Sequence, residues 1–290
     1  MAGSYSCTIQ LTSSATPLAA TGRGALTDLV PNPEIPAVQA DRMMGKVCVV
    51  TGGGSGIGRA AALKMAAEGA AAVLVAGRRE AEIGSTAAAC RALGTQALAI
   101  PTDVTREGDV ARLVDAAIEH FGRLDVAFNN AGFQERRAPI EQQASRVYDD
   151  VFDANVRSIF LCLRHQLPVM FARGEGRIVV NASVSGIRNP NLGLALYSAS
   201  KAAAISMIRS AALEAAPRGV RINAIAPGRV VTDMMQRSGV GDMAAVAAAL
   251  PLRRMGQPDD IAEAVIWLLS DAASYVVGHV LAADGGFLAS

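Results

Sequence analysis

The sequence predicts an α/β fold: a single doubly wound parallel sheet of about seven strands, flanked by helices. Three observations indicate this fold. Short apolar runs alternate with longer helical segments from Lys46 to the C-terminus, as in parallel sheets that are covered on both faces. A glycine-rich turn follows the first apolar run. The chain has 290 residues, enough for one large core and an appendage.

Seven short apolar runs are the expected strands. They cover residues 47–50, 72–76, 97–100, 124–128, 177–181, 221–226 and 280–282. The expected helices between them include residues 58–68, 108–121, 196–216 and 258–269. The Met- and Ala-rich residues 233–250 are expected to form an extra helical insertion before the last strand. Since nothing after residue 45 resembles a linker or a repeat, residues 43–290 are predicted to form one domain.

The N-terminal residues 1–42 differ from the rest of the chain. They are rich in Ser, Thr, Ala and Pro, and they show neither helical nor strand periodicity. We therefore predict a disordered extension. The segment lacks the basic and apolar regions of a secretory signal, and Arg23 is the one arginine in its first forty residues, too few for a transit peptide.

Composition argues against several classes of function. The 27 basic and 26 acidic side chains are spread along the chain, which argues against nucleic-acid and membrane-surface partners. No apolar run reaches the ~18 residues of a membrane span. The three histidines have no metal-site spacing, so we expect no metal. No CxxC pair occurs among Cys7, Cys48, Cys90 and Cys162, and we expect a reducing, cytoplasmic compartment.

The glycine-rich turn points to a dinucleotide. Glycines allow a tight strand-to-helix turn and let the backbone approach a pyrophosphate, to which the following helix offers free N–H groups. A glycine turn without function is the alternative, but the strand before it and the helix after it favour a Rossmann-type site. The predicted cofactor residues of this turn are Thr51, Gly52, Ser55, Gly56, Ile57 and Gly58.

The end of the second strand indicates which cofactor is bound. An NAD site places an acidic residue there to bind the ribose 2′-OH, but this chain has Gly77 followed by Arg78 and Arg79. Arg78 is available for a 2′-phosphate, so NADP(H) is favoured over NAD(H). Two alternatives stay open: the arginines are solvated at the start of a helix, or Glu80 reaches the ribose.

Later strand ends supply further predicted cofactor contacts. Asp103, followed by Val104, is placed to accept a hydrogen bond from adenine, although it is also an ordinary cap for the next helix. The fourth strand ends in the sequence Asn-Asn-Ala-Gly, where open α/β folds bind ligands. The predicted contacts in that sequence are Asn129, Ala131 and Gly132.

The predicted catalytic group combines Ser183 with Tyr197 and Lys201. The tyrosine and the lysine are four residues apart and so share one helical face. A nearby ammonium, and a cationic oxidised nicotinamide, would lower the pKa of the tyrosine, which could then exchange a proton with an alcohol or a carbonyl. Ser183 would polarise the substrate oxygen. A YxxxK pair alone is a weak signal; the glycine turn and the strand-end serine strengthen it.

These motifs together resemble the short-chain dehydrogenase/reductase family. The similarity covers residues 45–290 and rests on Thr51-Gly52-xxx-Gly56-x-Gly58, Asn129-Asn130-Ala131-Gly132, Asn155, Ser183, Tyr197-xxx-Lys201, Pro227-Gly228 and Asp284-Gly285-Gly286. The resemblance implies an NAD(P)-dependent oxidoreductase that transfers a hydride between the nicotinamide and a secondary alcohol or ketone. It also implies a homotetramer built from residues 147–170, residues 196–216 and the C-terminal strand.

The resemblance also implies individual roles. Tyr197 is the acid/base, and Lys201 lowers its pKa and binds the nicotinamide ribose. Asn155 holds a water that connects Lys201 to solvent. The segment Pro227, Gly228, Val230 and Thr232 holds the nicotinamide end of the cofactor.

The serine departs from the family spacing. Ser183 lies fourteen residues before Tyr197 instead of thirteen, whereas Ser185 lies twelve before it. Because Gly186 keeps the usual spacing from Ser183, we assign Ser183 as catalytic and place the extra residue in the loop 188–196. Ser185, Phe133 and Gln134 are then the predicted substrate contacts.

The surroundings of these residues predict a small-molecule substrate that is mid-sized and partly apolar. Two rival readings remain. A non-catalytic regulatory or scaffold protein with the same fold has no need of the four catalytic residues. A nucleotide-sugar epimerase or dehydratase has a different glycine spacing and a longer C-terminal part.

Overall fold

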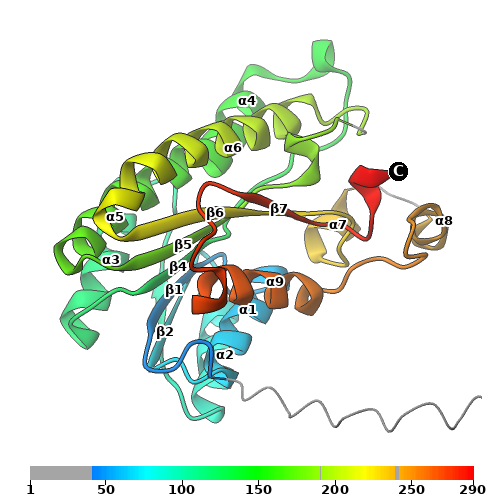
Figure 1. Ribbon diagram of the computed structural model, residues 1–290. Helices are drawn as coiled ribbons and strands as arrows, with labels where there is room; N and C mark the ends of the chain where they lie inside the picture. Colours follow the sequence, from blue (N-terminus) through cyan, green and yellow to red (C-terminus); the bar gives the residue numbers. More distant parts are fainter. Residues whose placement is uncertain (1–40, 190, 239–241) are drawn as a thin grey trace, which may run out of the picture. The chain divides into compact units, whose positions relative to one another are not determined.

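The computed structural model describes residues 41–189, 191–238 and 242–290. The predicted extension lies outside this part except for Asp41 and Arg42, as do Cys7 and Arg23. Within the described residues, seven strands form one parallel sheet in the order β3-β2-β1-β4-β5-β6-β7 (Figure 1). The predicted doubly wound parallel sheet is confirmed.

The strands lie where the apolar runs predicted them, with shifts at their ends. Their bounds are β1 Val47–Thr51, β2 Ala72–Gly77, β3 Gln96–Pro101, β4 Val126–Asn129, β5 Gly176–Asn181, β6 Val220–Pro227 and β7 Val280–Ala283. The fourth strand begins two residues later than predicted. The side chain of Asp125, instead of a main-chain carbonyl, accepts the hydrogen bond of the Val47 N–H there, at 2.8 Å.

The α-helices of the described residues connect and cover these strands. Their bounds are α1 Gly56–Ala67, α2 Glu80–Ala92, α3 Glu107–Phe121, α4 Ser145–Phe152, α5 Ser158–Arg173, α6 Ala195–Ala215, α7 Asp233–Arg237, α8 Met243–Ala249 and α9 Pro258–Leu269. The expected insertion at residues 233–250 contains the two short helices α7 and α8, and residues 239–241 between them lie outside the described part.

The sheet buries side chains on both faces because successive strand residues point in opposite directions. In β1, Cys48 and Val50 pack with α1, α2 and α9 on one face. Val47 and Val49 pack with α3, α5 and α6 on the other. Figure 1 shows the two helical layers on either side of the sheet.

The strand order fixes where a ligand can bind. From β1 the chain builds outward to β2 and β3, and it then returns to the other side of β1 with β4. Open parallel sheets bind ligands at the carboxyl ends of the strands next to such a switch point. None of the helices in the described residues is long and apolar enough to cross a membrane.

Candidate active site

The structure brings Ser183, Tyr197 and Lys201 together at the carboxyl edge of the sheet. Ser183 follows the end of β5, and the other two residues lie in the first two turns of α6. All three are buried. The Lys201 Nζ atom lies 5.7 Å from the centre of the Tyr197 ring, and the Ser183 hydroxyl lies near the Tyr197 phenol and lowers its pKa.

Lys201 is an ammonium held inside the protein. Its side chain is 3% exposed, and Nζ donates a hydrogen bond of 2.7 Å to the main-chain carbonyl of Asn181. Burial disfavours the charged form and lowers the pKa of Lys201 to about 8. The lysine is therefore close to its titration point at neutral pH.

The pKa of Tyr197 differs from the sequence-based expectation. The pattern predicted that Lys201 lowers it, but in this structure the pKa is raised. Burial of the phenol is the largest cause, and the nearby Glu135 carboxylate adds to it. The Ser183 hydroxyl acts in the opposite direction through its hydrogen bond. The protein alone therefore holds Tyr197 in its protonated form.

The two candidate serines have different partners. The Ser183 hydroxyl accepts a hydrogen bond of 3.1 Å from the Ser185 N–H, and it lies near the Tyr197 phenol. The Ser185 hydroxyl accepts a hydrogen bond from the side-chain amide of Asn191 at 3.0 Å. These contacts support Ser183 as the serine beside the tyrosine. Gly186 packs on α6 so closely that a Cβ would lie 2.8 Å from the Lys201 carbonyl oxygen.

Asn155 lies in a π-helical segment, η2 (Asp153–Arg157), between α4 and α5. Such segments often occur at functional sites. The fully buried side chain bonds both main-chain groups of Phe133, at 2.8 and 2.7 Å, and the Ser200 hydroxyl at 3.0 Å. Asn155 thus joins the segment after β4 to α6. Its role as the holder of a water stays a prediction.

The glycine turn between β1 and α1 fits a dinucleotide pyrophosphate. Gly58 lies under the turn, where a Cβ would collide with the Gly52 carbonyl and the Asn130 amide. The other glycines add no side chains at the N-terminus of α1, and Ser55 makes no side-chain cap bond there. The free N–H groups of this helix end suit an anion. The residues present therefore fit the cofactor that the sequence predicts.

Thr51 and Asn130 fasten the glycine turn to the end of β4. The Thr51 hydroxyl accepts hydrogen bonds from the N–H groups of Asn130 and Ala131, at 2.9 and 3.0 Å. The Asn130 side chain donates to the carbonyls of Thr51 and Gly52. Thr51 is 1% exposed, so it acts from inside the protein. A Cβ on Gly132 would lie 3.0 Å from Asn155 Oδ1 and 3.5 Å from Lys201 Nζ.

Two predicted cofactor contacts have protein partners that the sequence did not indicate. The side-chain amide of Asn129 pairs reciprocally with that of Gln166, with both bonds at 2.9 Å, and both side chains are buried. Asn129 is thus directed to α5, with both of its side-chain polar groups engaged. Asp103 Oδ1 accepts from the N–H and the hydroxyl of Thr105, in a turn ahead of α3. The capping residue of α3 is Arg106, so Asp103 does not have the capping role weighed as an alternative.

The segment after β6 reaches back to the glycine turn. Gly228, after Pro227, lies where a Cβ would be 2.7 Å from the Cα of Asp284. Val230 is buried and forms a bridge with Gly256. Thr232 caps α7 by accepting from the Met235 N–H at 3.2 Å.

The Thr232 methyl group also faces the glycine turn. It would lie 3.3 Å from a Cβ on Gly56. The two predicted cofactor segments therefore lie next to each other.

The arginines after β2 lie next to the glycine turn. Arg79 donates to the Ser55 hydroxyl at 3.1 Å and pairs with Glu82 at 2.5 Å. Arg78 is exposed. Among the remaining predicted contacts, Phe133 is 39% exposed, while Gln134, Ile57 and Val104 are partly buried.

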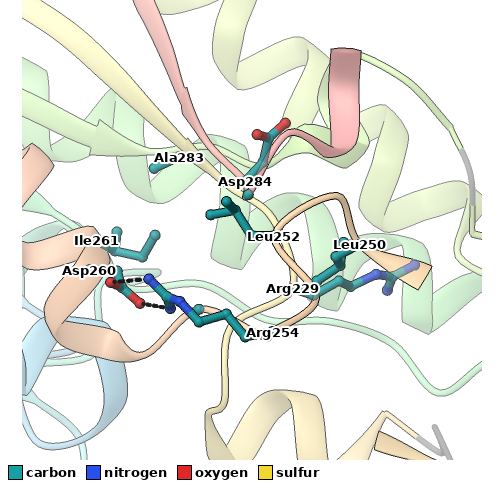
Figure 2. Close-up of a pocket in the computed structure, with 10 residues that line it drawn as sticks. Arg229, Leu250, Leu252, Arg254, Asp260, Ile261, Ala283 and Asp284 are labelled. Carbon is teal, nitrogen blue, oxygen red and sulfur yellow. Dashed lines mark hydrogen bonds and ion pairs between the residues drawn. The ribbon is translucent and has the colours of Figure 1, made fainter. Parts of the chain in front are cut away.

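A pocket of about 210 Å³ lies beside the 227–232 segment, which contributes Arg229 to its lining (Figure 2). Its lining includes Arg229, Leu252, Ile261 and Asp284, and Figure 2 shows the Arg254 guanidinium joined to the Asp260 carboxylate. None of Ser183, Tyr197 and Lys201 lines it, so this pocket is separate from the reacting groups.

Sequence reasoning missed two polar residues of the site. Glu135 accepts a hydrogen bond of 3.0 Å from the Tyr197 N–H. Asn181 supplies the carbonyl that holds Lys201, and its side-chain amide donates to Asn130 Oδ1 at 2.9 Å. Asn181 ends the predicted fifth strand, a position that could have drawn attention to it. Glu135 lies in a polar segment that gave no such signal.

A parallel sheet with a glycine turn at its switch point and a Ser–Tyr–Lys group at the same edge defines a dinucleotide-binding oxidoreductase. Comparisons with known proteins specify the family. The family model described as Enoyl-(Acyl carrier protein) reductase matches residues 52–288. This chain belongs to the short-chain dehydrogenase/reductase family, as the sequence motifs predicted.

Three relatives illustrate the similarity. The A-factor type gamma-butyrolactone 1'-reductase (1S-forming) of Streptomyces virginiae is 39% identical over 247 residues, which cover 83% of this chain and 95% of that protein. The cis-4-hydroxycyclohexanecarboxylate dehydrogenase of Sinomonas cyclohexanicum is 41% identical over 244 residues, 84% and 97% of the two chains. A structure of 7 alpha-hydroxysteroid dehydrogenase complexed with NADH and 7-oxo glycochenodeoxycholic acid has a TM-score of 0.81 and 33% identity, covering 86% of this chain and 96% of that one.

Burial of Lys201 predicts a gain in stability when its charge is removed. Below pH 8 the lysine is protonated in the folded and the unfolded chain, so the folded state carries the full cost of the buried charge. This cost falls as the pH rises from about 8, the folded pKa, to 10.5, the unfolded value, because the unfolded chain alone then keeps the proton. We expect Lys201→Met to raise the melting temperature at pH 7, with the gain lost by about pH 10.5.

The measurement is thermal unfolding of both proteins, without cofactor, over this pH range. Arg112→Met is the control, since Arg112 forms an exposed ion pair with Asp109. Its effect on stability should be small throughout. A Lys201→Met protein that is less stable than the wild type at pH 7 would contradict the expectation.

Proposed function

We propose that this chain transfers a hydride between a nicotinamide cofactor and a secondary alcohol or ketone. The observation that carries the proposal is the contact of the Tyr197 phenol with Ser183, beside the Lys201 ammonium and at the sheet edge that holds the glycine turn. When bound, the nicotinamide supplies the hydride for reduction and accepts it in oxidation. The residues that would hold it are those of the glycine turn, the end of β4 and the 227–232 segment.

Residues of the chain itself donate and accept the proton of the reaction. In reduction, the Ser183 hydroxyl donates a hydrogen bond to the carbonyl oxygen of the substrate and stabilises the negative charge that develops on it. The protonated Tyr197 phenol then gives its proton to that oxygen. In oxidation, the phenolate takes the proton of the alcohol, and the positive charge of Lys201 favours this phenolate. The proton acceptor and its cation thus share one rigid helix.

We propose NADP(H) as the preferred cofactor over NAD(H). Gly77 ends β2 where an NAD site has an acidic residue, and Arg78 and Arg79 follow it. Arg79 already contacts the glycine turn through Ser55, and its ion pair with Glu82 fixes its direction. Arg78 is exposed and free to bind a 2′-phosphate through charge-assisted hydrogen bonds.

We propose a mid-sized, partly apolar ketone or secondary alcohol as the substrate. The segment after β4 presents Phe133, which is partly exposed, and the loop before α6 presents Ile187 and Leu192, both exposed. The relatives named above are, by their names, a gamma-butyrolactone reductase, a hydroxycyclohexanecarboxylate dehydrogenase and a hydroxysteroid dehydrogenase, which supports a cyclic substrate.

We propose a homotetramer as the assembly. A groove of about 340 Å³ lies on α4, η2, α5 and α6, lined by Tyr148, Phe152, Phe160 and Met207 among others. Tyr148 and Phe160 are about half exposed, which is unusual for large apolar side chains on adjacent helices. The cytoplasmic location that the sequence favours stays a prediction.

Tyr197→Phe tests the reaction. Without the phenol hydroxyl, proton transfer is lost, and we expect kcat to fall by about 10²–10⁴-fold while cofactor binding is kept. The assay follows the absorbance of the reduced cofactor with a panel of cyclic and open-chain ketones. Tyr275→Phe is the matched control, since Tyr275 is fully exposed. Tight cofactor binding without turnover of any substrate by the wild type would favour the regulatory alternative instead.

Arg78→Ala tests the cofactor preference. We expect the Kd of NADPH to rise about tenfold, which corresponds to ~1.4 kcal/mol. The Kd of NADH should change little because NADH lacks the 2′-phosphate, so it serves as the internal control. Tighter binding of NADH than of NADPH by the wild type would overturn the preference.

Phe160→Asp tests the assembly. A carboxylate in the apolar groove is costly to bury at an interface, so the variant should be smaller than a tetramer by light scattering coupled to gel filtration. Leu93→Asp, an exposed leucine at the end of α2, is the control and should remain tetrameric. A monomeric wild type would rule the tetramer out.

A further inference from the structure

Glu135 is a buried carboxylate next to the catalytic helix. It lies three residues after Gly132, in the segment between β4 and α4, and is 2% exposed. Its Oε1 atom accepts a hydrogen bond of 3.0 Å from the N–H of Tyr197. Tyr197 is the third residue of α6, whose capping residue Leu194 has no side-chain acceptor. Glu135 therefore binds one of the helix N–H groups that have no partner within the helix.

Capping alone does not account for a carboxylate at this position. Its second oxygen, Oε2, is enclosed and has no hydrogen-bond partner among the described residues. A buried carboxylate with an unpaired oxygen lowers the free energy of unfolding. A neutral Gln or Asn would cap α6 as well. Buried charges of this kind are typical of functional sites, where they shift the pKa of a neighbouring group.

The neighbour in question is Tyr197. Within the described residues, the charged groups next to Tyr197 come from two elements: Lys201 from α6 itself, with Nζ 5.7 Å from the ring centre, and Glu135 from the segment after β4, which binds the Tyr197 N–H and whose charge acts on the phenol. Ser183 adds an uncharged hydroxyl from the end of β5. The charges of Glu135 and Lys201 have opposite effects on ionisation of the phenol, since a negative charge disfavours phenolate and a positive charge favours it.

We infer that Glu135 is a positioning residue for the reaction proposed above: it anchors Tyr197 through the main chain and, by its charge, sets the pH at which the phenol ionises. The carboxylate offsets part of the effect of Lys201, so Tyr197 keeps its proton at neutral pH until a substrate oxygen receives it. The anchor also holds the start of α6, and with it the direction of the phenol.

Glu135→Gln separates the charge from the anchor, since glutamine keeps an oxygen that can accept from the Tyr197 N–H. We expect the pH profiles of kcat/KM to move to lower pH by roughly one unit. The acid limb of alcohol oxidation and the alkaline limb of ketone reduction should move together, because both report ionisation of Tyr197. Glu141→Gln is the matched control, an exposed glutamate in the same segment, and should leave both profiles unchanged.

A second readout does not depend on turnover. The phenolate absorbance of each protein is titrated without cofactor, and the titration of the same protein carrying Tyr197→Phe is subtracted. The phenolate of Tyr197 should form at lower pH in Glu135→Gln. Glu135→Ala removes the anchor as well, so it should show the same shift and in addition a lower kcat.

The outcomes distinguish this inference from the proposed function. Wild-type protein without turnover on any substrate contradicts the proposed function, whatever the titrations show. An active wild type, with unshifted profiles and unshifted phenolate titrations in both Glu135 variants, overturns the inference and leaves Glu135 a structural cap.

Discussion

A continuous path of hydrogen bonds across the carboxyl ends of β1, β4 and β5 holds the site together. The Thr51 hydroxyl binds the main chain of Asn130, and the Asn130 side chain binds that of Asn181. The Asn181 carbonyl in turn accepts the hydrogen bond of the Lys201 ammonium. The glycine turn, which would hold the cofactor, is thereby joined to the catalytic helix through side chains that have little freedom to move. The relative positions of cofactor and acid/base depend on this path.

The same path explains how the fold keeps an ammonium inside. Burial lowers the pKa of Lys201, but the Asn181 carbonyl gives the ammonium one fixed acceptor at 2.7 Å. Asn155 and Gly132 border the same space, and Gly132 leaves it open because a Cβ there would approach both polar side chains. The protein thus holds a cationic group at a cost in stability, as active sites commonly do.

Much of the fold and part of the site could be predicted from the sequence. Strand and helix periodicity is a local property, so the seven apolar runs and α6 emerged within a few residues of their bounds. The glycine turn and the Tyr197–Lys201 pair have residue spacings that cofactor binding and proton transfer require. The structure brings them to the carboxyl edge of the sheet. The serine assignment needed Gly186, whose missing side chain lets the chain after Ser183 pack on α6.

What the sequence could not show depends on which side chains meet across the fold. Asn129 and Asn130 are neighbours of the same type, yet Asn129 at the end of β4 is directed to Gln166 of α5, and Asn130 just after it is directed to the glycine turn. Glu135 is 62 residues from Tyr197, and its partner is a main-chain N–H that no sequence pattern records. Contacts of this kind depend on how β4, the segment after it and the helices α5 and α6 are placed relative to one another in the fold. The residues with recognisable spacing thus define the chemistry, while residues without it, such as Asn181 and Glu135, determine the geometry in which that chemistry takes place.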